Sequence, residues 1–472
     1  MRPVSDLAGP ANAAQLPLYR GGHPAISGIR RPLHDFRSRP TTAGRVIDWI
    51  IVGLMLLAVV SMFAVSSSLL TNLKVHYLTA GGGFYEKLHP ATYLTLFAWL
   101  VLLMRNGDPI GEINRSFSDA KLMLIYLFCW VCLLIQMFVL DRPFTVIIDT
   151  FLLPLLLCLV IWRLTASQRK PLVWAIHLTI LLNVVLGYYE YFSGHHLIPL
   201  TVGDVVVLGE WRSSALLGHP LTASGIVGGY ILALVLRPAL CPPIILRLPL
   251  LAFCLGSLMA FGGRTALVTV LLVIGSIFCF EIFRLLRGER TSLPLVIGAM
   301  CLLFVAGAGI FAALDLGIFD KMLLRFSSDK GSTLARYATF NLLSHFDWYE
   351  LVLGPNPVRV SALQSQLGLN YGIENFWISC IVQFGLIHTV LLTIGLVAFF
   401  VELLRRSTSG AYAIVLLVLV IAASSVSFSS KNIQLAQFIV LVALLLPREP
   451  SPAAGAPRQL PRKRPDARLN PR

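Results

Sequence analysis

Long runs of apolar residues alternate with short polar stretches along most of this 472-residue chain. A helix needs about 20 apolar residues to cross the hydrocarbon core of a membrane. On this criterion the pattern predicts about twelve membrane-spanning helices, of which the second, seventh and twelfth are short. They are expected near residues 46–66, 89–104, 121–140, 144–162, 171–189, 213–235, 246–262, 265–283, 293–313, 373–401, 411–428 and 433–447.

Three polar regions flank or interrupt these runs. Residues 1–45 and 448–472 are rich in Arg and Pro and lack an apolar period, so we expect two disordered basic tails. Residues 314–372 form the one long polar segment between spans, separating nine spans in 46–313 from three in 373–447. Because loops of this length are usually functional or disordered, and this one carries Leu and aromatic residues at helical spacing, we expect short helices in it.

One helix of this segment is expected to begin near Gly331-Ser332-Thr333, with Ser332 or Thr333 as its N-terminal cap. Its helical period places Leu334, Tyr337, Ala338, Leu342 and His345 on one face, and Arg336, Phe340 and Leu343 on another.

Composition agrees with a membrane protein. Hydrophobic residues make up 56% of the chain and charged residues only 13%, and the mean hydropathy is +0.78. Soluble domains are roughly 25% charged, so this chain could not solvate a globular surface. We therefore expect an all-α polytopic membrane protein. The eight cysteines all lie in or beside apolar runs, which argues against a disulfide framework or a zinc site.

The net charge of +15 is explained by topology rather than by a nucleic-acid partner. Cytoplasmic loops of membrane proteins are enriched in Lys and Arg. Placing both termini in the cytoplasm puts 27 of the 38 Lys and Arg residues inside, including seven in each tail. No cleavable signal peptide is visible, because about 45 polar residues precede the first apolar run. The 314–372 segment then becomes a large extracytoplasmic loop.

This orientation singles out three arginines that lie outside against the charge bias, namely Arg212, Arg264 and Arg336. Each could simply bind a lipid headgroup phosphate, although Arg264 stands in a tight Gly262-Gly263-Arg264 turn where smaller residues would fit. Together, three guanidinium groups on separate segments make a candidate anion clamp, because arginine binds phosphates bidentately and stays charged. An extracytoplasmic enzyme has no nucleotide supply, so the substrate would be a lipid-linked phosphate or pyrophosphate. No paired acidic metal motif occurs in the outer loops, and we expect no metal or other cofactor.

Two residues are the main candidates for a general base that activates an acceptor hydroxyl. Glu374 lies where the outer loop enters the tenth span, and an apolar boundary favours a raised pKa. It could equally be an acid at the start of a helix, where the helix macrodipole favours a negative charge. His345 could accept a proton near neutral pH or be a plain surface residue. His219 would share a helical face with Arg212 as a substrate-binding residue unless a helix begins at Pro220.

Other motifs point away from common alternatives. Walker, dinucleotide-binding and helical HExxH patterns are absent from the sequence, which argues against an ATPase, a nucleotide-dependent enzyme and a zincin. His195-His196 lacks the spacing of a metal site and is expected to be solvated.

Three stretches taken in order resemble the O-antigen polymerase and ligase superfamily, and most closely its bacterial exopolysaccharide repeat-unit polymerases. They are WRSSALLGHPLTASGIVGGYILAL, SLMAFGGRTALVTVLL, and the outer loop ending in YGIENFWISCIVQFGLIHTVLL, and together they span about 209–390. In that family an arginine precedes a Gly-x-Pro segment, a second follows a short Ser/Gly turn, and a third lies in a large periplasmic loop that ends in a polar-Asn-aromatic helix entry.

The resemblance implies a GT-C-like, metal-independent and inverting glycosyltransferase of the bacterial inner membrane. Its substrate would be an undecaprenyl-pyrophosphate-linked oligosaccharide, its site would include Arg212, Arg264 and Arg336, and a chain-length regulator and export machinery are possible partners. The ligase branch typically has a histidine before the Asn of the loop-exit motif, where this chain has Glu374, so a polymerase is favoured over a ligase. A transporter of the same lipid-linked sugar and a non-catalytic scaffold are the alternatives from other classes, although no similarity between the two halves is visible.

Overall fold

The computed structural model describes residues 42–288 and 332–448, apart from 80, 203–204, 208, 237–241, 370–371, 426–427 and 429, together with residues 315 and 317. The expected span at 293–313, most of the outer loop before Ser332, and nearly all of both expected tails lie outside the described residues.

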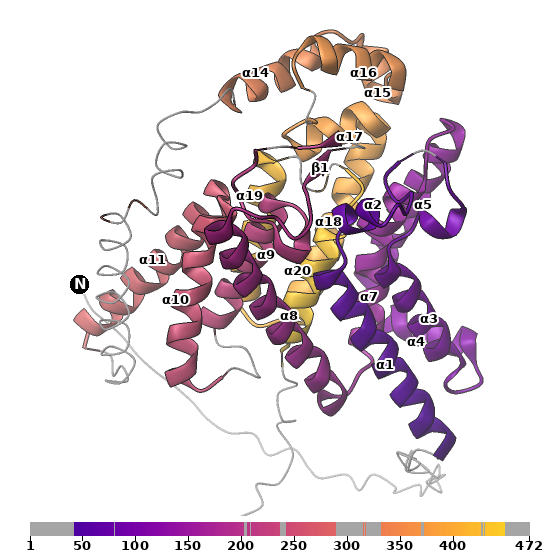
Figure 1. The fold of residues 1–472 in the computed structure, drawn as a ribbon. Helices are drawn as coiled ribbons and strands as arrows, with labels where there is room; N and C mark the ends of the chain where they lie inside the picture. Colours follow the sequence, from indigo (N-terminus) through magenta and orange to yellow (C-terminus); the bar gives the residue numbers. More distant parts are fainter. Residues whose placement is uncertain are drawn as a thin grey trace, which may run out of the picture.

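The apolar runs form helices (Figure 1). A chain that cannot hydrogen-bond to water must satisfy its backbone N–H and C=O groups internally, and a helix does so. The bundle helices are α1 (Thr42–Ala64), α3 (Pro90–Met104), α5 (Lys121–Val139), α7 (Leu153–Ile161), α8 (Ala166–Ser193), α9 (Pro220–Val235), α10 (Ile244–Phe261), α11 (Arg264–Leu286), α18 (Leu386–Arg405), α19 (Ala411–Ser424) and α20 (Gln434–Leu445). Short elements join them: α2 (Ser67–Asn72), η1 (Phe84–Glu86), α4 (Pro109–Asp119), α6 (Thr145–Ile147), the π-helical turn η2 (Ile148–Leu152), the paired strands β1 (Thr201–Val202) and β2 (Val205–Val206), and η3 (Ala215–Leu217).

Five helices of the described chain are long and apolar enough to cross a membrane: α1, α5, α8, α11 and α18. They carry large apolar side chains that face outward, among them Leu57, Phe128, Leu178 and Leu272. Soluble monomers rarely expose apolar surface on this scale. The fold is therefore helical, and these helices indicate a membrane protein, as the sequence predicts.

The shorter apolar helices form the interior of the bundle. Every residue of α7 and α20 is buried, and α9 is buried along nearly its whole length. Small residues allow this close packing. The Cβ of an alanine at Gly228 or Gly229 of α9 would lie about 3.0–3.1 Å from Val270 and Phe438 side-chain atoms of neighbouring helices.

The predicted span at 373–401 is two helices rather than one, α17 (Phe376–Phe384) and α18. They are separated at Gly385, whose φ is +84°. A Cβ there would lie 2.6 Å from the backbone of Val352 and Leu353, so the chain passes too closely for any side chain. The apolar pattern continues through this break, because α17 is largely buried and α18 is apolar on both its buried and its outward-facing sides.

The outer segment contains α14 (Ser332–Leu343), α15 (Trp348–Leu353) and α16 (Pro357–Gln366), which lie together beyond the end of the bundle above α17 (Figure 1). A small apolar core joins them to α17: Leu342, Phe346, Leu369, Ile373, Ile378 and Val382. The side chains of Gln136 in α5 and of Arg142 in the turn after it donate to the carbonyls of Leu353 and Pro355.

The predicted faces of α14 are partly wrong. Leu342 is buried, but Leu334 and Tyr337 are about 70% exposed (73% and 70%). The helix packs instead through Ala335, Ala338, Thr339, Leu342 and Leu343. The small side chains on this face let the helix backbone come close to the apolar core that it shares with α17. His345 lies beyond the end of the helix.

Candidate functional site

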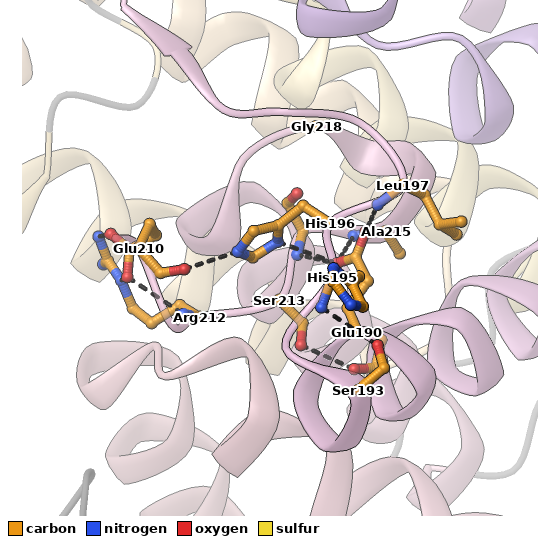
Figure 2. Close-up of polar contacts among 12 residues, drawn as sticks. Glu190, Ser193, His195, His196, Leu197, Glu210, Arg212, Ser213, Ala215 and Gly218 are labelled. Carbon is orange, nitrogen blue, oxygen red and sulfur yellow. Dashed lines mark hydrogen bonds and ion pairs between the residues drawn. The ribbon is translucent and has the colours of Figure 1, made fainter. Parts of the chain in front are cut away.

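The loop between α8 and α9 carries Arg212 at the end of the bundle where α9 begins. The Arg212 guanidinium donates from Nε and Nη2 to the two carboxylate oxygens of Glu210, at 2.8 and 2.5 Å (Figure 2). Both side chains are only 13% exposed. No described residue accepts a hydrogen bond from Arg212 Nη1. Glu210 thus orients the guanidinium through Nε and Nη2 and makes no hydrogen bond to Nη1.

Glu190, near the C-terminal end of α8, holds this loop in place. Its buried carboxylate accepts backbone N–H hydrogen bonds from Leu197, Ser214 and Ala215, at 2.8–2.9 Å (Figure 2). Ala215 has a φ of +48°, a conformation that costs free energy for a residue with a Cβ. The three hydrogen bonds to one buried carboxylate offset that cost and fix the backbone that follows Arg212.

His196 bridges the same two acidic residues and is not solvated as the sequence suggested. Its Nε2 lies 2.6 Å from the Glu210 carbonyl oxygen, and its Nδ1 lies 3.7 Å from Glu190 Oε2. His195 is exposed. His196 therefore contacts the loop, whereas His195 lies at the surface.

Arg264 is the first residue of α11 and follows the turn at Gly262, whose φ is +64°. A Cβ at Gly262 would lie 2.8 Å from Arg212 Cγ and Cδ, so the Arg212 stem rests directly on this turn. The Ser213 N–H also donates to the Ala260 carbonyl, at 3.1 Å. The fold thus brings Arg212 to the turn that leads into Arg264.

His219 precedes α9 as its N-terminal cap, and its Nδ1 accepts the Leu221 N–H at 3.2 Å. The helix begins at Pro220, so His219 and Arg212 do not share a helical face, and the alternative that the sequence left open is confirmed. Because Nδ1 accepts a backbone N–H, the ring is neutral and carries its proton on Nε2.

Arg336 and Glu374 lie beside each other at the junction between the outer segment and α17. Arg336 Nε is 3.8 Å from Glu374 Oε2, and the two side chains are 51% and 29% exposed. Asn375, rather than Glu374, caps α17 by accepting the Ile378 N–H at 3.1 Å. Glu374 thus stands one residue before the helix cap, which leaves its carboxylate to the ion pair.

His345 lies apart from these groups. It is exposed, its Nδ1 is 2.8 Å from the Asn341 carbonyl oxygen, and its own carbonyl accepts from Arg359. The described contacts thus make two clusters of sequence-predicted residues, Arg212 with the Arg264 turn and Arg336 with Glu374.

A third polar centre escaped the sequence interpretation. Asp149 lies in η2, fully buried, and accepts hydrogen bonds from Tyr77 Oη, Thr92 Oγ1 and the His89 N–H at 2.9, 2.6 and 3.1 Å. Lys431 covers it from the α19–α20 loop, donating to the Tyr77 and Lys87 carbonyls with its Nζ 4.0 Å from the Tyr77 ring centroid. Asp149 is the only charged residue in the 144–162 run, a signal that could have been used.

Comparison with known proteins adds no family to these observations, since no family model, curated protein or solved structure matches the chain. In the part of the chain that the structure describes, no cluster of three or more His, Cys, Asp or Glu side chains is arranged to hold a metal ion. The site is thus defined by its arginines and their carboxylate partners.

Proposed function

We propose that this protein is an inner-membrane glycosyltransferase that joins undecaprenyl-pyrophosphate-linked oligosaccharide repeats into an exopolysaccharide or O-antigen-type polymer. In this proposal about twelve helices span the membrane in a GT-C-like arrangement, both termini are cytoplasmic, and 314–372 is the large periplasmic loop. Support comes from the apolar helices, from the charge bias of the sequence, and from the resemblance described above.

The observation that carries the proposal is an ion pair at the edge of an apolar groove. Glu374, which pairs with Arg336, precedes Phe376 by two residues, and both Phe376 and Trp377 line the groove. The rest of its lining is almost wholly apolar: Phe151, Thr393, Leu396, Val397, Phe400, Val418, Leu419, Ala422, Phe428 and Leu435. A polyprenyl pyrophosphate needs a cation for its head and an apolar surface for its chain, and this junction offers both.

The arginines would act on the leaving group. In the transfer step an acceptor hydroxyl attacks the anomeric carbon of the donor, and the bond from that carbon to the pyrophosphate oxygen breaks. Arg212, Arg264 and Arg336 would stabilise the negative charge that develops on the pyrophosphate, in place of a divalent cation. Attack from the opposite face inverts the anomeric configuration.

Glu374 is better placed than His345 to accept the proton of the attacking hydroxyl. It lies beside Arg336, whereas His345 is an exposed residue hydrogen-bonded to Asn341 and Arg359. Because a general base must come within hydrogen-bond reach of its proton, we assign this role to Glu374 and expect His345 to be dispensable.

A transporter of the same lipid-linked sugar is the second candidate, and Asp149 is the observation that favours it. An ionisable residue buried within a span is expensive and often marks a transport pathway. However, Asp149 is fully occupied by hydrogen bonds from Tyr77, Thr92 and His89, as a structural centre would be.

The test is to incubate the purified protein with a lipid-linked repeat unit and separate the products on a gel. A ladder of products supports the polymerase, and a single shift supports a ligase. An unchanged substrate excludes both transferase activities and favours transport or a scaffold. Arg336→Ala should abolish the ladder. Arg359→Ala is a matched control, because Arg359 also lies on the outer helices and pairs with an acid, Glu350, at 2.6 Å.

A further inference from the structure

A second, polar pocket opens at the end of the bundle where α1 ends and α3, α9 and α20 begin. Its volume is about 50 Å³. The lining comprises Met62, Val65, Ser66, Ser67, Tyr77, His89, Leu217, His219, Thr222, Asn432, Ile433, Gln434 and Gln437. Of the predicted site residues only His219 belongs to it. Nothing in the sequence groups these positions, because they come from five separate segments.

Two buried amide groups in this lining lack hydrogen-bond partners among the described residues. They are Gln434 Nε2, a donor, and Gln437 Oε1, an acceptor. The two residues are only 2% and 3% exposed, and their spacing places them on one face of α20. Leaving such groups unpaired costs free energy, so a buried pair of this kind in a pocket indicates a ligand that supplies the missing partners.

A hydrogen bond orients the Gln437 amide, and packing confines the Gln434 amide. Gln437 Nε2 donates to the Met62 carbonyl at 2.5 Å, which leaves Oε1 as the unpaired atom. The Gln434 amide lies against Gly225 of α9, where a Cβ would be 3.1 Å from Nε2. A donor and an acceptor are thus held ready, one helical turn apart.

The lining contains no Asp, Glu, Lys or Arg. Its two histidines are neutral, because the Nδ1 atoms of His89 and His219 both accept backbone N–H groups, from Ala91 and Leu221. A charged ligand would lose its hydration without gaining an opposite charge. A neutral ligand that both donates and accepts, such as a vicinal diol, matches the lining.

The pocket is joined to the Arg212 loop. Gly218, beside His219, accepts a hydrogen bond from Ser68 Oγ at 3.0 Å, and a Cβ at Gly218 would lie 2.3 Å from Ser66 Oγ. The segment that runs from Arg212 to His219 is therefore fixed to α2 at one end and to Glu190 at the other. A ligand in the pocket would lie one short loop away from the Arg212 guanidinium.

We propose that this pocket binds the hydroxyl-bearing edge of a neutral sugar ring, with Gln437 Oε1 accepting from one hydroxyl and Gln434 Nε2 donating to its neighbour. Identifying that ring as part of the lipid-linked substrate rests on the proposed function. The preference for a neutral polyhydroxylated ligand rests only on the lining.

The test uses the full-length protein in lipid nanodiscs, free of sugar-based detergents. Saturation-transfer NMR would be recorded with the methyl glycosides of glucose, galactose and N-acetylglucosamine, and with the methyl glycoside of glucuronic acid as a charged comparison. We expect saturation of the ring protons of at least one glycoside, and binding about tenfold weaker in Gln434→Met, as loss of a buried hydrogen bond predicts.

Gly225→Ala provides a second variant that keeps every amide. The added methyl would displace the Gln434 side chain without removing a hydrogen-bond donor, and alanine is compatible with the helix. We expect weaker glycoside binding here too. Gln136→Met, at an exposed hydrogen bond on α5, is the control and should bind as the wild type does.

Absence of saturation with all three glycosides would overturn the proposal, as would equal binding by the wild type, Gln434→Met and Gly225→Ala, since the pocket would then hold only water. The two proposals fail separately. Arg212→Ala should lose the ladder of products and keep glycoside binding. A wild-type protein that binds glycosides but forms no ladder with lipid-linked repeats would refute the proposed function and leave the sugar pocket standing.

Discussion

The two clusters of predicted site residues differ in how firmly the fold holds them. Arg212 makes two hydrogen bonds to one carboxylate, is 13% exposed, and rests on the Gly262 turn. Arg336 makes a single contact of 3.8 Å with Glu374 and is 51% exposed. The first arginine is therefore oriented before a ligand arrives, whereas the second must gain order when one binds.

This difference suggests a division of work between the two regions. The preorganised guanidinium of Arg212 loses little conformational entropy when a ligand binds. This end of the bundle is therefore suited to binding a fixed group such as a phosphate. The solvent-screened Arg336–Glu374 pair contributes little to stability and can exchange partners easily. We expect variants of the first region to affect both folding and function, and variants of the second to affect function alone.

The largest effect on stability is expected from Glu190→Ala. It leaves three backbone N–H groups without an acceptor, those of Ser214 and Ala215 buried, and removes the restraint on Ala215. The free energy of unfolding should fall by on the order of 3 kcal/mol. Thermal unfolding in detergent measures it, with Glu350→Ala on the outer helices as control. Equal melting temperatures for the two variants would abolish the contrast between the regions.

Gly262→Ala should have the next largest effect. Alanine at a φ of +64° costs about 1–2 kcal/mol, and its methyl group would displace the Arg212 stem. Both melting temperature and polymer formation should fall. Gly275→Ala is the matched control on α11, since a Cβ there meets nothing within 4 Å. Normal polymer formation by Gly262→Ala would show that the orientation of Arg212 does not matter.

The pH dependence of stability tests whether Lys431 belongs to the tightly held region. Burial is the main cause that lowers the pKa of Lys431 to about 8, against an opposing effect of Asp149. Below pH 8 the lysine is charged in both folded and unfolded chains. Between pH 8 and its ordinary 10.5 the folded chain binds fewer protons than the unfolded one, so the free energy of unfolding rises with pH.

Allowing for solvent screening, this rise should be about 1 kcal/mol between pH 7 and 9.5. It is measured as the change with pH in the stability difference between the wild type and Lys431→Met. Lys74→Met, at an exposed position, should show no such change. If the stability difference between the wild type and Lys431→Met did not change with pH, the lysine would be solvated rather than held over Asp149.

The smallest effect on stability is expected from Arg336→Ala. Loss of a half-exposed ion pair should change the free energy of unfolding by less than about 0.5 kcal/mol, as should Arg359→Ala. Only Arg336→Ala should abolish polymer formation. A drop in melting temperature as large as that of Gly262→Ala would place Arg336 with the tightly held groups and refute the division of work.

Hydrophobic periodicity was enough to locate the helices of the described chain, because an apolar run that must satisfy its own backbone has few alternatives to a helix. It could not find the break at Gly385, where apolar residues continue on both sides and only a backbone contact with Val352 and Leu353 requires the turn. It also misplaced the faces of α14, since Ala335 and Ala338 pack closely while Leu334 and Tyr337 face outward.

For the site, the charge bias singled out Arg212, Arg264 and Arg336 as unusual, but not their partners. The pairing of Arg336 with Glu374 joins residues 38 positions apart, and spacing alone carries no information on such a contact. Glu190 and Asp149 were missed because each is a single acidic residue inside an apolar run, and Lys431 because its role depends on Asp149.

The shortness of α20 has a consequence for the membrane itself. Its 12 residues span about 18 Å, whereas the hydrocarbon core is about 30 Å thick. Its lower end is fixed level with that of the 20-residue α18, since Arg448 and Thr408 N–H groups donate to the Arg406 and Leu446 carbonyls. Gln434 then lies about 12 Å, measured along the helix axis, short of the level at which α18 begins. The polar residues Ser430, Lys431 and Asn432 therefore stand at a depth where a helix as long as α18 would still present its own apolar side chains.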